Sequence, residues 1–185
     1  MGGNRGARRS GTMLHLGSAV VGLAAMSMVA TACNDDELSA TSDVEPAAAY
    51  SAIVQWQAGE QEPVMNDNGE EQLPVIYVVA ADGETIDVGV QADVAAATDA
   101  IADVRFADES AEAFHDGVDG EPVIDEGVML VVDPLPDPAP TIDVELLRYL
   151  AVESSTPFIL QITADEAATE SSGIGVATVT SVTEP

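Results

Sequence analysis

Apolar residues recur at two different spacings along the chain, and the helical spacing comes first. Tyr50, Ile53 and Val54 share one helical face behind a proline that suits a first turn, and they predict a helix over residues 46–58. A second stripe, at steps of four and three, predicts a helix over residues 89–103. Its members are Val90, Val94, Ala97, Ile101 and Val104.

Strand-like patterns dominate the second half of the chain. Two continuous apolar runs, residues 75–80 and 128–132, are typical of buried strands. Residues 142–146 and 158–163 alternate between apolar and polar side chains, as half-buried antiparallel strands do. Three further strands are also expected, at residues 85–88, 104–107 and 174–182.

These patterns predict a fold of the α+β class. We expect two helices packed on one face of a mainly antiparallel sheet of five or six strands, all within one domain over residues 46–185. A domain of this length can bury a modest core of its own.

The first 32 residues differ in composition from the rest of the chain. They hold Arg5, Arg8 and Arg9, three of the five basic residues, and an uncharged run follows from Thr12 to Ala32. This order of charge and apolar residues is typical of an export signal. An uncleaved anchor is the alternative, because such a run can span about 30 Å as a helix. Both interpretations place the arginines in the cytoplasm and the remainder outside.

The end of the uncharged run carries the only cysteine, in "VATAC". This stretch resembles the bacterial lipobox, with small residues in front of a cysteine, although Ala30 stands where that family most often has leucine. The resemblance implies a diacylglycerol thioether on Cys33 and cleavage of the signal peptide between Ala32 and Cys33. It also implies a lipid anchor in the cell membrane, at its extracytoplasmic face. The alternative is a small buried cysteine that ends a helix.

Residues 33–45 are acidic and nearly free of apolar side chains, so we expect a lipidated, disordered tether ahead of the domain. The charge of the domain is equally one-sided. From Cys33 onward, 33 acidic residues face two arginines, a formal charge of −31. Such a field repels phosphate, which argues against nucleic acid and allows a basic or cationic envelope partner. Solubility, or adaptation to salty surroundings, is the preferred reason for the charge, and a binding role for it is the alternative.

Catalytic motifs are absent from the sequence. His115, beside Asp116, is the only histidine after the signal, and no nucleophile elbow, zinc-protease motif or P-loop occurs. We therefore expect no enzyme, with an envelope hydrolase as the third choice. An acidic, glycine-containing loop offers oxygen ligands for calcium without the spacing of an EF-hand. Its candidate ligands are Asp116, Asp119, Glu121, Asp125 and Glu126.

The segments "PVIYV", "VRFAD" and "DEGVMLVV" together resemble small uncharacterised lipoproteins of high-GC Gram-positive bacteria. That resemblance supports location and fold and brings no activity with it. The sequence thus predicts a membrane-anchored extracytoplasmic lipoprotein with a non-catalytic binding domain. A cation-responsive or calcium-binding module is the alternative, and no other cofactor is expected.

Overall fold

The computed structural model describes residues 42–65, 68–69, 71–117, 120–165 and 176–185. The expected signal peptide, the cleavage site at Ala32 and Cys33, and most of the tether lie outside the described residues, as does Asp119. In the part of the chain that is described, no helix combines the length and apolar character needed to cross a membrane.

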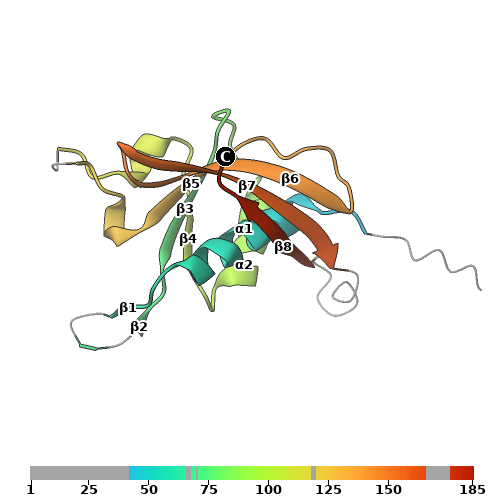
Figure 1. Cartoon of the computed structure of the whole chain (residues 1–185). Helices are drawn as coiled ribbons and strands as arrows, with labels where there is room; N and C mark the ends of the chain where they lie inside the picture. Colours follow the sequence, from blue (N-terminus) through green and yellow to red (C-terminus); the bar gives the residue numbers. More distant parts are fainter. Residues whose placement is uncertain (1–41, 66–67, 70, 118–119, 166–175) are drawn as a thin grey trace, which may run out of the picture. The chain divides into compact units, whose positions relative to one another are not determined.

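Two helices and a six-stranded sheet form the fold, as predicted (Figure 1). The helices are α1 (Pro46–Glu60) and α2 (Val88–Thr98). The strands of the sheet, in spatial order, are β4 (Asp103–Phe106), β3 (Val75–Ala80), β5 (Val128–Val132), β6 (Thr141–Ala151), β7 (Ser154–Asp165) and β8 (Val176–Thr183). A separate small hairpin joins β1 (Val64–Met65) to β2 (Glu71–Gln72).

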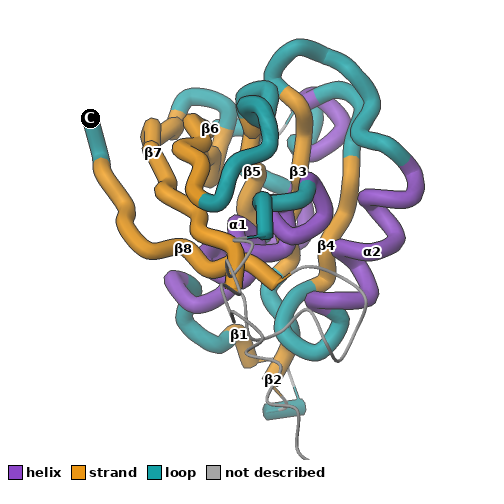
Figure 2. The backbone as a smooth tube through the Cα atoms, turned by 90° about the vertical axis from the view of Figure 1, so that its right-hand side faces the viewer, coloured by secondary structure: helices purple, strands orange, loops and turns teal. Residues whose placement is uncertain are grey.

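The sheet is mixed, although most of its pairings are antiparallel. Strand β3 runs parallel to both of its neighbours, β4 and β5, and α2 makes the crossover from β3 to β4. From β5 to β8 each strand is antiparallel to the next. Figure 2 shows α2 beside β4, at the opposite end of the sheet from β8. The predicted α+β class, with a mainly antiparallel sheet, is confirmed.

Both helices pack on the same face of the sheet, and the main core lies beneath them. Ile53 of α1 and Ile76, Leu130, Leu160 and Ile162 of the strands are fully buried there. Apolar burial of this kind is the main favourable contribution to folding. The first turns of α1 are buried on nearly every side, because α1 contacts α2 as well as strands β3, β7 and β8.

A second, smaller core lies on the opposite face, which we call the outer face. Tyr77, Val79 and Met129 point to this side from β3 and β5, and Ala113 and Val123 cover them. The covering residues belong to the segment 107–127, which we call the outer segment; its described residues form two short 3₁₀ turns, Ser110–Ala113 and Ile124–Glu126. The continuous apolar runs of β3 and β5 are thus explained, since both faces of these strands are buried.

The predicted strand at 85–88 is wrong, and α2 is shorter than predicted. The Asp87 carboxylate accepts hydrogen bonds from the backbone N–H groups of Gly89 (2.8 Å) and Val90 (3.3 Å), so it caps a helix that begins at Val88. Both edges of β3 are already paired with β4 and β5, which leaves no edge for a returning strand. The helix ends at Thr98, and its buried positions are Val94 and Thr98.

The central strands β6 and β7 are longer than predicted and form a hairpin that extends past the other strands. Alternation of burial continues beyond Leu146 to Arg148, although Leu147 and Tyr149 on the other side are also apolar or aromatic. Tyr149 packs edge-on against Phe114 of the outer segment, with ring centroids 6.2 Å apart. Because Leu147 and Tyr149 are not polar, the apolar–polar alternation that predicts a strand breaks off after Leu146 in the sequence.

Candidate functional site

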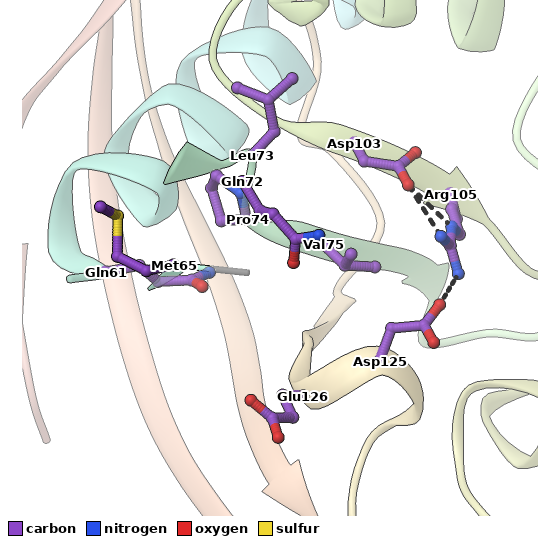
Figure 3. A pocket seen from close by; sticks show the side chains of 10 residues that line it. All are labelled: Gln61, Met65, Gln72, Leu73, Pro74, Val75, Asp103, Arg105, Asp125 and Glu126. Atoms are coloured by element: carbon purple, nitrogen blue, oxygen red, sulfur yellow. Dashed lines mark hydrogen bonds and ion pairs between the residues drawn. The ribbon is translucent and has the colours of Figure 1, made fainter. Parts of the chain in front are cut away.

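A cavity of about 780 Å³ opens where β3 and β4 begin (Figure 3). The chain brings five parts of the fold to it: the end of α1, the small hairpin, the start of β3, the start of β4, and the turn before β5. Its lining residues are Gln61, Met65, Gln72, Leu73, Pro74, Val75, Asp103, Arg105, Asp125 and Glu126.

Arg105 is the charged centre of this cavity. Its Nε and Nη2 donate to Oδ2 of Asp103 at 3.2 and 2.8 Å, and its Nη1 donates to Oδ2 of Asp125 at 2.6 Å. Nη1 also donates to the Tyr77 hydroxyl at 2.9 Å, and the guanidinium lies 5.5 Å from the centre of the Tyr77 ring. These hydrogen bonds, to Asp103 first, then Asp125 and Tyr77, raise the pKa of Arg105, which keeps it charged.

The contacts of Arg105 decide what it can do. Four hydrogen bonds occupy all but one of its N–H donors, so little of the guanidinium is left for an anionic ligand. Instead it connects β3 and β4 to the turn Ile124–Glu126 of the outer segment. We call Arg105, Asp103, Asp125 and Tyr77 the arginine clamp. Its role is to hold the outer segment against the sheet edge.

The turn held by the clamp has an unusual backbone. Asp125 and Glu126 both have positive φ, at 58° and 54°, a backbone region that residues other than glycine rarely adopt. Gly127 follows, so close to β3 that an added Cβ would lie 2.8 Å from the carbonyl oxygen of Val75. In Figure 3 the Asp125 side chain points to Arg105, whereas Glu126 points away from it.

The structure separates the residues predicted to bind calcium. Asp125 is held by Arg105, and Glu126 lies in the same cavity. Asp116 and Glu121 are exposed in the part of the loop that is closed on itself by the bridge Phe114↔Val123 and joined to the far end of β6 by the bridge Pro122↔Ala151. Among the described residues no three His, Cys, Asp or Glu side chains gather where they could hold a metal ion. Calcium binding stays a prediction.

His115 lies in the same loop and is exposed. Its backbone N–H donates to the carbonyl of Pro122 at 3.0 Å, which fixes the main chain of the loop. The side chain lines neither the arginine cavity nor the groove described next. The hydrolase alternative stays a prediction.

A second hollow, which we call the outer groove, has a volume of about 580 Å³ on the outer face. Val79, Met129 and Val131 form its floor, and the aromatic rings of Phe114 and Tyr149 lie along it. The remaining lining residues are Ala80, Ala81, Gly83, Asp108, Glu109, Ser110, Ala111 and Val152. Sequence reasoning missed this groove, although the runs "VIYVVA" and "VMLVV" indicated that something besides the two helices must cover the second face.

A few acidic residues line each hollow: Asp103, Asp125 and Glu126 in the arginine cavity, and Asp108 and Glu109 in the outer groove. Every Asp and Glu side chain whose burial the structure describes is exposed. The two arginines of the domain are both engaged: Arg105 in the clamp, and Arg148 over the Phe158 ring at 4.6 Å from its centre. Phe158 in turn packs against Trp56 of α1, with ring centroids 5.1 Å apart.

Neither protein-family models, nor curated proteins, nor solved structures yield a match to this chain.

Proposed function

We propose that this chain is a lipid-anchored extracytoplasmic lipoprotein whose domain is non-catalytic and binds a basic partner in the cell envelope. The observation that carries the binding role is the distribution of charge. All described carboxylates are exposed, while both arginines of the domain are engaged in contacts of their own. A surface of this kind attracts cations over a range of about 10 Å at 0.1 M salt and repels nucleic acid.

Support for the anchor comes from the sequence before the domain. The arginines, the uncharged run and "VATAC" follow one another in the order of a lipoprotein signal. The described domain begins close behind them, since Val44 already donates its backbone N–H to the carbonyl of Ala139 at 2.9 Å. A tether of about a dozen residues reaches at most about 40 Å when fully extended, so the domain would work near the membrane.

A binding role is favoured over a catalytic one by the contents of the two hollows. The arginine cavity holds an arginine whose donors are nearly all used, and the outer groove is lined by apolar, aromatic and carboxylate side chains. General acid–base catalysis needs a titrating group placed next to the bond that reacts. His115 is the side chain best suited to such work, and it is exposed outside both hollows.

The binding role can be tested with the whole chain immobilised in detergent and exposed to detergent-solubilised envelope proteins. We expect the proteins retained at low salt to carry a net positive charge and to be released as salt rises. An unrelated acidic protein of matched net charge is the control. Retention no greater than that of the control would contradict the proposal.

A further inference from the structure

The outer groove combines an apolar lining with exposed carboxylates at its rim. Its floor is apolar and largely buried, since Val79 and Met129 are only 4% and 1% exposed. Its rim includes two adjacent exposed carboxylates, Asp108 and Glu109, at the start of the outer segment. Val152, at the tip of the β6–β7 hairpin, is 41% exposed and adds an apolar wall.

A further carboxylate, Asp82, lies between the lining residues Ala81 and Gly83, and neither arginine lines the groove. Arg105 is held in the clamp at the other end of β3, and Arg148 packs on the helix side of the sheet. An occupant of this groove therefore meets apolar surface below it and negative charge beside it.

We infer that the outer groove docks a peptide segment in which lysine or arginine residues alternate with apolar side chains. This inference rests on the proposed function and adds the place and the chemistry of the partner. Apolar side chains would pack on Val131, Tyr149 and Val152, the lining residues that keep exposed area, and remove that area from water. The cationic side chains would lie against Asp108 and Glu109 at the rim.

The size of the groove suits such a segment. Pockets of about 300–1,000 Å³ hold small ligands, and a hollow of 580 Å³ has room for a few side chains. The groove is open on one side, which leaves a path for a chain to enter and leave. The rim carboxylates Asp108 and Glu109 are exposed to water, so their attraction for a cationic side chain is weak and is screened further by salt.

The test uses the full-length chain in non-ionic detergent and a fluorescein-labelled nonapeptide of alternating lysine and leucine, followed by fluorescence anisotropy. Two control peptides separate the two parts of the chemistry. One replaces each leucine with serine and keeps the charge, and the other replaces each lysine with glutamate. We expect the lysine–leucine peptide to bind most tightly, the lysine–serine peptide more weakly, and the glutamate peptide not at all.

Matched variants locate the binding. Asp108→Asn with Glu109→Gln should raise the Kd at low salt on the order of fivefold, because two rim charges are lost. Asp93→Asn with Asp99→Asn removes the same charge from exposed positions in and after α2, and it should change the Kd less than about twofold. The Thr85 hydroxyl donates to Asp108 at 3.1 Å, and the Asp108→Asn substitution keeps a side-chain oxygen that can accept this hydrogen bond.

A second pair of variants tests the apolar contacts between the peptide and the groove. Val152→Ser in the groove should weaken binding of the lysine–leucine peptide, whereas Val182→Ser, at a similarly exposed site on β8, should not. Equal effects within either pair would overturn the inference. So would a dimer of the chain that forms with rising concentration and is lost in Val152→Ser, because the groove would then belong to a second copy.

The two proposals fail in different ways. Retention of basic envelope proteins that is insensitive to both groove variants would remove the groove and leave the proposed function standing. Absence of binding to the cationic peptides and to basic envelope proteins alike would remove both.

Discussion

The two faces of the sheet are built in different ways. The helix face is covered by α1 and α2, and core residues from all parts of the domain meet there. The outer face is covered only over β3 and β5, by the segment 107–127 with its two short turns. That segment is held by a few specific contacts: the arginine clamp, the bridge from Pro122 to Ala151 of β6, and a small apolar cluster. The comparison indicates that the irregular cover contributes lining residues to both hollows, whereas the helix face is closed by regular structure.

The largest effect expected on the outer face comes from Gly127→Ala. An added Cβ would lie 2.8 Å from the Val75 carbonyl oxygen, so either the turn or β3 must shift. We expect the free energy of unfolding to fall by about 1–3 kcal/mol, as for overpacking in a close-packed interior. Chemical denaturation would measure it.

Gly59→Ala on the helix face is the matched control. Gly59 lies inside α1, and nothing lies within 4 Å of its added Cβ. There the same methyl should be neutral or stabilise by up to about 1 kcal/mol. A similar loss in both variants would mean that close packing of the outer turn has no special role.

The second effect is local and comes from breaking the clamp. Arg105→Gln removes both ion pairs while keeping a polar side chain. Because Arg105 is 38% exposed and its partners more so, we expect a global loss of only about 1 kcal/mol. Hydrogen exchange should nonetheless speed up at backbone amides of the outer segment near Asp125, and remain unchanged in α1. Uniform acceleration in both regions would contradict a local clamp.

The third effect is a pH dependence of the free energy of unfolding, and it arises from Tyr50 on the helix face. Burial first, and then the charge of Asp82, raise the pKa of Tyr50 in the folded protein. The neutral phenol therefore contributes stability that is complete below the unfolded pKa of about 10 and is lost as pH rises through the folded value. We expect the free energy of unfolding to fall above about pH 10, and to fall less steeply in Tyr50→Phe. Identical pH profiles for the two proteins would refute this contribution.

The smallest effect distinguishes screening from a calcium site. Sodium chloride should raise the melting temperature, because like charges repel and salt screens them over about 10 Å at 0.1 M. Calcium chloride at equal ionic strength should add nothing further under the proposed function. An additional stabilisation that disappears in Asp119→Asn with Asp125→Asn would instead establish the calcium alternative.

Particular residues explain what the sequence could and could not predict. The buried strands 75–80 and 128–132 and the helix from Pro46 were predictable, because continuous apolar runs and a first-turn proline are local signals. The strand predicted at 85–88 failed because Asp87 caps a helix, and because the parallel neighbours of β3 are distant in sequence.

The candidate site was predictable only in part. The acidic charge and the acidic loop that contains Asp125 are visible in the sequence, where Asp125 was predicted only as a calcium ligand, but the clamp joins Asp125 to Arg105 across 20 positions of sequence. No local sequence pattern predicts an ion pair between residues so far apart in the chain. The outer groove depends on where the β6–β7 hairpin ends relative to Phe114, which is likewise a tertiary contact.

The most direct test of the account is the intact mass of the chain recovered from the membrane fraction of cells that express it. We predict a species that begins at Cys33 and carries a diacylglyceryl group on the cysteine sulfur, while Cys33→Ser yields only unprocessed precursor. A membrane-bound chain that retains residues 1–32, or that begins at Cys33 with a free thiol, would contradict the lipid anchor.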